Sequence, residues 1–191
     1  MILPVNIKKE LINFSEIYKR LGCSKQNISY WNAHFYSTQS QRSIRSVIEN
    51  AVVLFGLSPE DSEMLANSAG LTLYPSCGNL YEFLELHYNG KIKELSENAL
   101  ISERMLRYYK KITPTKQALL AIAVYLNCGS SETDALLRSY GYCLSKSSAA
   151  DIAVMWFIDN NTNKNGNVLL TEINIVLDNM GLPLLMTRQI C

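Results

Sequence analysis

The sequence lacks the long apolar runs and the paired cysteines that mark several protein classes. No run approaches the roughly 18 apolar residues that a membrane helix needs. The start, MILPVNIKKELINF, lacks the cationic segment and long apolar stretch of a signal peptide. The five cysteines are odd in number and never form a C-x-x-C pair, so neither a disulfide framework nor a zinc site is indicated. We therefore expect a cytoplasmic protein with reduced thiols and no membrane partner.

Motifs of nucleophilic catalysis are also missing. His34 and His87 are far apart in the chain and neither adjoins a cysteine, and neither a G-x-S-x-G motif nor a P-loop occurs. We therefore predict that the protein is not an enzyme. The sequence gives no candidate catalytic residue, metal site or cofactor.

The whole chain has little excess of either charge, but its parts differ in net charge. The formal net charge is only +1, so a polyanionic partner must be argued from the distribution of charge. Basic residues outnumber acidic ones by seven to three in residues 1–50 and again in residues 101–150, whereas acids prevail in the other two blocks. Each basic block contains a candidate helix-turn-helix.

The chain also lacks any segment that alternates over a strand length. With 48% hydrophobic residues it can bury a core, and its apolar residues recur at helical spacing. We predict an all-α fold.

Residues 94–126 are predicted to form a helix-turn-helix followed by a buried supporting helix. Leu95, Ile101, Leu106 and Tyr109 are spaced to close a two-helix corner over a third helix. Within this stretch, residues 103–116 contain five cations and a single acid, Glu103. These cations are Arg104, Arg107, Lys110, Lys111 and Lys116.

A similar corner is predicted near the start of the chain. Ser15 is a candidate cap of a first helix, Gly22 suits the turn and Ser24 is a candidate cap of the second helix. Ile28 and Trp31 are expected to face inward. Further on, Ser58 and Pro59 predict another helix start.

The two corners belong to an internal repeat. A shift of 71 residues lays residues 51–73 on residues 122–144 without a gap. Upstream the shift is 78, which places Ser24 on Ser102 and Trp31 on Tyr109. We interpret the chain as two diverged helix-turn-helix units in tandem, residues 1–74 and 79–191. The second unit is extended by two C-terminal helices, in which Ile152, Met155, Trp156 and the flanking Val154 are expected to be buried.

Residues 80–185 resemble helix-turn-helix proteins of the lambda-repressor-like class, often labelled the XRE family. The resembling segments are SERMLRYYKK, PTKQALLAIAVYLN, ETDALLRSYGY and EINIVLDNMGLPLL. The resemblance implies DNA binding and transcriptional regulation. Where the family usually has a small residue in the first helix of the corner and a glycine in the turn, this chain has Ser96 and Leu100. A non-glycine residue in a left-handed turn costs about 1 to 2 kcal/mol, so Leu100 predicts a reshaped turn.

On this interpretation the partner is double-stranded DNA, and the second helix of each corner carries the side chains that reach base edges. These side chains are Glu103, Arg104, Arg107 and Tyr108, with Lys25, Gln26, Ser29 and Tyr30 in the first unit. Phosphate contacts are expected from Lys110, Lys111, Lys116, Arg42 and Arg45. The alternative is that all of these are ordinary solvated helix faces.

Two further alternatives remain open. The scaffold could instead serve as a protein-interaction module, an accessory or antitoxin-like regulator of a partner protein. If DNA is the partner, the two units either act as a built-in pseudo-dimer or divide DNA binding and homodimer formation between them. Residues 161–172, NTNKNGNVLLTE, have nearly the spacing of a calcium loop but only one carboxylate, so we favour an Asn-rich turn there.

Overall fold

The computed structural model describes residues 18–19, 21–34, 38–160 and 165–185 of the 191-residue chain. Within these ranges every regular element is an α-helix, which confirms the predicted all-α fold. No helix in the same ranges combines the length and the apolar character needed to cross a membrane.

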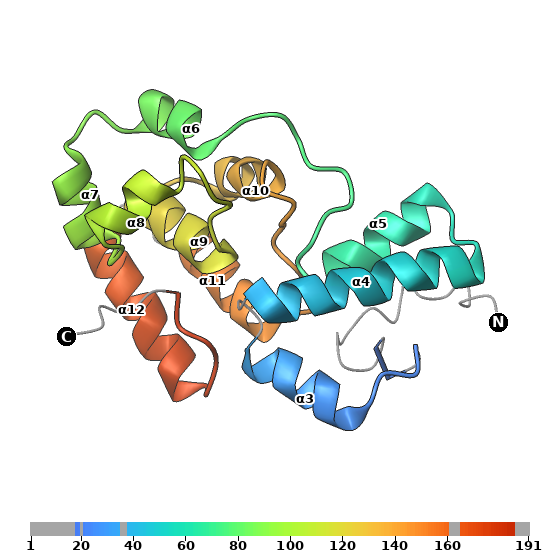
Figure 1. The fold of residues 1–191 in the computed structure, drawn as a ribbon. Coiled ribbons are helices and arrows are strands. Elements are labelled where there is room, and N and C mark those ends of the chain that lie inside the picture. The colour runs from blue at the N-terminus through green and yellow to red at the C-terminus, as the bar shows by residue number, and fades with distance from the viewer. Residues whose placement is uncertain (1–17, 20, 35–37, 161–164, 186–191) are drawn as a thin grey trace.

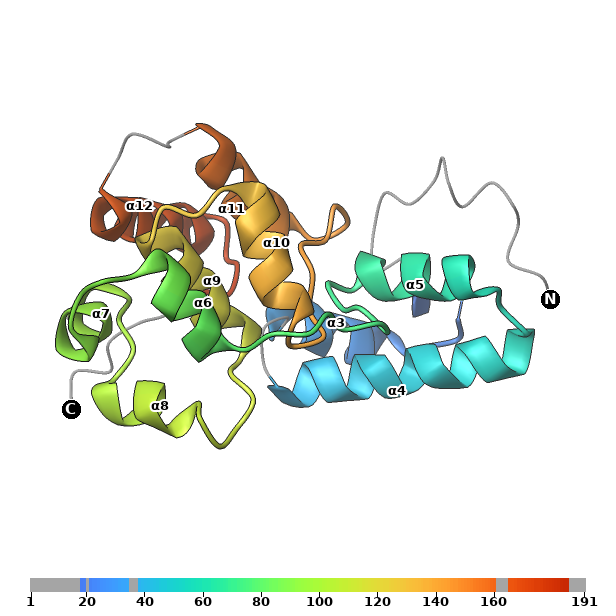
Figure 2. The same ribbon diagram turned by 90° about the horizontal axis from the view of Figure 1, so that it is seen from above.

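The helices form two groups that lie side by side in Figures 1 and 2. The N-terminal half contains α3 (Lys25–Ala33), α4 (Thr38–Phe55) and α5 (Pro59–Ser68). The C-terminal half contains α6 (Leu80–His87), α7 (Ile92–Asn98), α8 (Glu103–Tyr108), α9 (Lys116–Tyr125), α10 (Ser130–Arg138), α11 (Ala149–Asn160) and α12 (Gly166–Asn179).

Hydroxyl side chains set the starts of several helices. The side chains of Ser24, Ser58 and Ser102 each accept a hydrogen bond from the backbone amide three residues later. This bond satisfies one of the amides that a helix start leaves without an intrahelical partner. The predicted caps at Ser24 and Ser58 are confirmed, whereas Ser15 lies outside the described residues.

The core of the C-terminal half is built around α9. Every residue of this helix from Ala118 to Val124 is fully buried, as expected of the supporting helix. The helix packs against α10 and α12, and α11 in turn packs against both of these helices. A single apolar cluster joins this core to Ile44 and Ile48 of α4, so the two halves share one interior.

The predicted burial of two α11 residues is wrong. The side chains of Ile152 and Trp156 are 47% and 58% exposed, respectively. Helix α11 is apolar around most of its circumference, so periodicity alone does not select its inner face. The inner face carries Asp151, Ile158 and Val154, the last buried as predicted, and the Asp151 carboxylate is paired there with Lys116.

The Asn-rich stretch is also shorter than a calcium loop requires. Helix α12 begins at Gly166, so residues 166–172 are helical and Glu172 lies in the second turn of the helix. The remaining positions, 161–164, lie outside the described residues.

The turn between α7 and α8 keeps a left-handed residue without a glycine. Leu100 has a φ of 57°, and Gly22, the residue at the matching place in the first corner, has a φ of 81°. The expectation that Leu100 reshapes the turn is therefore wrong. Leu100 accepts the left-handed conformation while its side chain packs against the core.

The two halves meet through backbone atoms at an isolated antiparallel bridge between Leu71 and Tyr142. These residues are related by the shift of 71 found in the sequence. The flanking bonds, each 3.0 Å long, run from the amide of Thr72 to the carbonyl of Gly141 and from the amide of Cys143 to the carbonyl of Gly70.

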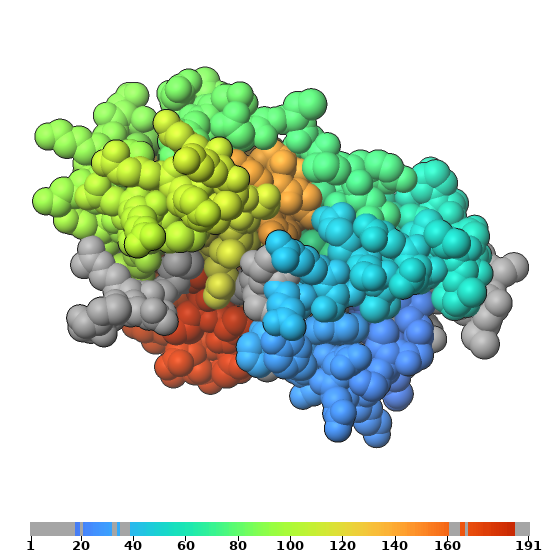
Figure 3. Space-filling view, viewed as in Figure 1, coloured from blue at the N-terminus to red at the C-terminus, as the bar shows by residue number. Residues whose placement is uncertain are grey.

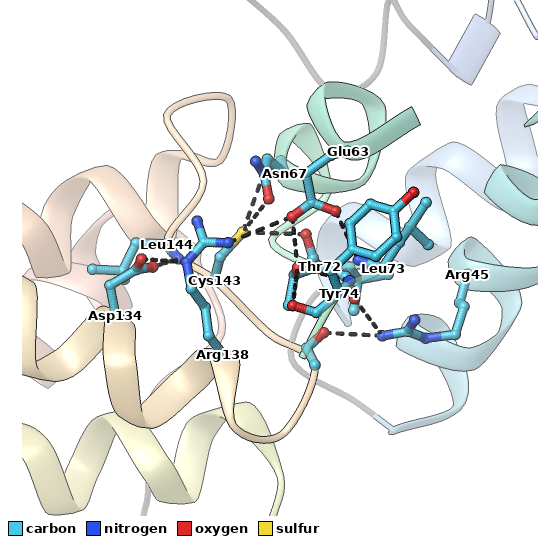
Figure 4. Close-up of polar contacts among 12 residues, drawn as sticks. Arg45, Glu63, Asn67, Thr72, Leu73, Tyr74, Asp134, Arg138, Cys143 and Leu144 are labelled. Carbon is cyan, nitrogen blue, oxygen red and sulfur yellow. Dashed lines mark hydrogen bonds and ion pairs between the residues drawn. The ribbon is translucent and has the colours of Figure 1, made fainter. Parts of the chain in front are cut away.

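Side-chain contacts at this junction are paired in the same way. Glu63 accepts a hydrogen bond from the amide of Leu73 at 2.9 Å, and Asp134 accepts one from the amide of Leu144 at 3.3 Å. Arg138 lies between the two carboxylates, 2.6 Å from Asp134 and 3.4 Å from Glu63 (Figure 4). Contacts that recur under one constant shift are what a two-fold relation between similar units produces.

Candidate nucleic-acid interface

The corner formed by α7 and α8 is anchored from beneath by apolar side chains. Leu95, Ile101, Leu106 and Tyr109 are all buried, as the sequence predicted. Ser102 caps α8 through a 3.2 Å bond from the amide of Met105. The helix therefore has a fixed base and a fixed start, and its remaining side chains face outward.

Cationic side chains cover the outer face of α8. Arg104, Arg107 and Tyr108 are exposed. Arg107 Nη2 lies 3.3 Å from Glu103 Oε2, an exposed pair one helical turn apart. Such surface pairs contribute only about 0.3 to 0.5 kcal/mol, so Arg107 is easily diverted to another acceptor. Neither arginine is tucked against another part of the described chain.

Lys110 and Lys111 follow α8, and their side chains have different neighbours. Lys110 Nζ lies 4.5 Å from the centre of the Tyr81 ring, a cation–π contact with α6. Tyr81 in turn donates a 2.7 Å hydrogen bond to the carbonyl of Leu106. Lys111 is exposed and lines a cleft toward α4. Both lysines stay at the surface beside α8.

Lys116 does not lie at the surface, and the expectation that it contacts phosphates is wrong. Its side chain is 0% exposed, and its Nζ lies 2.6 Å from Asp151 Oδ2, which is also 0% exposed. Lys116 Nζ also donates to the carbonyl of Cys143 at 2.6 Å and to that of Gly70 at 3.4 Å. Its position at the start of the buried helix α9 places it inside the junction.

Arg45 occupies the matching place in the N-terminal half. It is related to Lys116 by the same shift of 71 residues. Its Nη2 donates to the carbonyl of Gly141 at 2.9 Å and to that of Thr72 at 3.3 Å. Unlike Lys116, Arg45 is only half-buried and has no carboxylate partner among the described residues. Its neighbour Arg42 is exposed.

The first corner presents a less cationic helix. Lys25, Gln26, Ser29 and Tyr30 of α3 are exposed, as expected, and Tyr30 stacks on His34 with ring centres 4.4 Å apart. In Figure 1, α3 lies below α4, whereas α8 lies beside α7 and α9. The two candidate second helices therefore belong to different parts of the surface.

The structure unites residues that the sequence kept apart. Arg42 and Arg45 of α4 and Lys111 after α8 line one cleft of about 570 Å³ between the two halves. In Figure 3 the surface of residues 103–112 lies beside the start of α4. The excess of basic residues in the two blocks was the only signal of this grouping, because a sequence does not show that the blocks touch.

Two buried tyrosines border the cleft. Burial raises the pKa of Tyr142, and the nearby charges of Arg45 and Arg42 oppose that rise. Burial likewise raises the pKa of Tyr109, against a hydrogen bond with Thr115. Both phenols therefore stay neutral near pH 7 and are available as hydrogen-bond donors.

Known proteins provide no further guide to the site. The chain matches no protein-family model, no curated protein and no solved structure. Among the described side chains, no three histidine, cysteine or acidic groups are close enough together to hold a metal ion.

Proposed function

We propose that the protein binds duplex DNA through the corner formed by α7 and α8 and acts as a regulator of transcription. The observation that carries the proposal is the outer face of α8. Exposed cations lie on this face, Ser102 caps the helix, and buried apolar side chains hold the helix in place. This arrangement presents a short helix and its basic side chains as major-groove binding requires. The resemblance of residues 80–185 to lambda-repressor-like proteins supports the same function.

The side chains divide into two roles. Arg104 and Arg107 project from α8 and are suited to bidentate hydrogen bonds with guanine. Lys110 and Lys111 follow the helix, and we assign them to phosphates, with Arg42 across the cleft. Lys116 has no role in binding because it is buried.

A salt titration tests the proposal. Affinity for a random-sequence duplex, measured by fluorescence anisotropy, should fall steeply between about 50 and 200 mM salt, because phosphate contacts release counterions. Arg104→Glu and Arg107→Glu should each weaken binding and reduce the salt dependence. Lys146→Glu is the matched control, since Lys146 is exposed and lies beside a different cleft. Absence of binding at the lowest salt would refute the proposal.

A protein-interaction module is the second candidate, and one observation favours it. Ile152 and Trp156 lie one turn apart on α11 and are both about half exposed. Aromatic side chains at the surface are enriched in protein interfaces. If duplex binding is absent, Trp156→Ala and Ile152→Ser become the variants to test against a purified partner, with Ile175→Ser of α12 as the control.

A further inference from the structure

The cleft between α4 and the segment after α8 has properties that DNA binding by α8 does not explain. It is walled by Gln41, Arg42 and Arg45 on one side and by Met105, Tyr109 and residues 111–113 on the other. Its volume of about 570 Å³ lies within the range of about 300 to 1,000 Å³ that is usual for small-molecule sites. It is wide enough for more than one side chain or ion.

The charge in the cleft has one sign. Three cations line it, Arg42, Arg45 and Lys111, and among the described residues no acid does. Within the described ranges none of these three has an ion pair. By contrast, another half-buried arginine in the same ranges, Arg138, has an acidic partner, because it is bonded to Asp134. A concave surface with unpaired charge of one sign attracts a ligand of the other sign.

The donors in the cleft suit a tetrahedral anion. Arg45 is fixed by two bonds that use Nη2 alone, so Nη1 and Nε have no hydrogen-bond partner among the described residues. Arginine binds phosphate through two parallel N–H donors, and neutral tyrosine and threonine hydroxyls supply further donors. Tyr142 and Thr113 are such hydroxyls. Leu71, Met105 and Ile112 add an apolar wall for an organic group.

We propose that this cleft binds a small phosphorylated molecule, with Arg42, Arg45 and Lys111 holding the phosphate. The ligand would touch Met105 of α8 and Lys111 directly. If α8 binds DNA as proposed above, ligand and duplex therefore compete for Lys111 and Arg42, and the ligand lowers DNA affinity. Binding of the ligand itself does not depend on DNA.

Calorimetry on the full chain tests the site without DNA. Phenyl phosphate supplies both the anion and an apolar ring, and inorganic pyrophosphate supplies the anion alone. We expect both to bind and phenyl phosphate to bind more tightly. Arg42→Gln and Lys111→Gln should each weaken binding by about tenfold, because each removes a charge-assisted hydrogen bond. Arg45 is not substituted because it also tethers the junction.

Lys93→Gln is the matched control, since Lys93 is an exposed cation on α7 that does not line the cleft. Unchanged affinity in this variant, with loss in the other two, supports the site. Failure of both probes to bind, or equal binding by all variants, overturns it. If neither probe binds but Arg42→Gln and Lys111→Gln weaken duplex binding, the cleft holds a phosphate of the DNA backbone, which overturns the small-molecule site and leaves the proposed function standing.

Discussion

Arg45 and Lys116 occupy matching places in the two halves, but their burial and their charge pairing differ. Each donates to one carbonyl of its own half and one of the other half, and the acceptors correspond under the same shift of 71 residues. Lys116 is closed in by the C-terminal extension, and Asp151 of α11 neutralises it. Arg45 is half-buried, without a carboxylate partner among the described residues.

The comparison shows how a neighbouring helix changes the role of a cation at matching positions of the two halves. Burying an ammonium group is unfavourable unless a counterion and hydrogen bonds replace water, and α11 supplies the counterion. Lys116 therefore has a structural role. Arg45 opens onto a cleft in which no described lining residue is acidic, and part of its guanidinium stays available to a ligand.

The largest expected effect follows from removing the buried cation. Lys116→Met removes the cation that neutralises the buried Asp151 carboxylate, which should lower the free energy of unfolding by about 3 to 5 kcal/mol. Urea denaturation followed by circular dichroism measures the loss. Arg45→Met, its counterpart, should cost only about 1 to 2 kcal/mol because water still reaches the site.

A double variant sharpens this prediction. Lys116→Met combined with Asp151→Leu removes both charges, and it should be more stable than Lys116→Met alone. Equal losses in Lys116→Met and Arg45→Met would show that burial of the cation does not distinguish the two halves.

The glycines of the junction should also respond unequally. Gly70 and Gly141 have φ angles of 67° and 78°, so an alanine costs about 1 to 2 kcal/mol at either position. At Gly70 the new Cβ would collide with Lys116 Nζ, and at Gly141 it would lie 2.9 Å from Arg45 Nη2. Arg45 has room to move, whereas Lys116 is enclosed. Gly70→Ala should therefore be the more destabilising substitution in thermal unfolding.

A smaller effect is expected at the two corner turns. At position 100, glycine should be more stable than alanine by about 1 kcal/mol, because only glycine adopts the left-handed conformation without strain. At position 22, Gly22→Ala should lose a similar amount. Denaturation of Leu100→Gly, Leu100→Ala and Gly22→Ala measures both differences. A preference for alanine at position 100 would contradict the observed φ of 57°.

The smallest expected effect is a change in the rate at which a buried thiol at the junction is labelled. Burial raises the pKa of the Cys143 thiol to about 12, so at pH 8 the group is almost entirely protonated and unreactive. Exposed Cys77 should react with a maleimide at once, and Cys143 only when the halves separate. Mass spectrometry of peptides after timed labelling distinguishes them. Lys116→Met should accelerate labelling of Cys143 more than Arg45→Met does.

Local signals in the sequence predicted most of the helices. Ser24 and Ser58 mark helix starts through hydroxyl caps, a property of neighbouring residues. The buried character of α9 follows from a long apolar run. These features depend on contacts within a few positions along the chain.

The errors concern contacts between distant residues. Lys116 appeared to belong to a basic cluster because its partner, Asp151, is 35 residues away in sequence. The sequence predicted a buried Trp156 because α11 is apolar around most of its circumference, and periodicity alone does not select the face that packs inward. The cleft was missed for a related reason, since its cations come from α4 and from the segment after α8.

The bridge at Leu71 and Tyr142 has a consequence for how the chain can vary. Its bonds join main-chain amides and carbonyls, which every residue except proline possesses. Substitutions of the Leu71 and Tyr142 side chains leave these main-chain bonds in place, so the two halves can keep their mutual orientation while those side chains change. Arg45 and Lys116 each add a bond to a carbonyl of the other half, and they differ in charge pairing while the main-chain bonds stay the same.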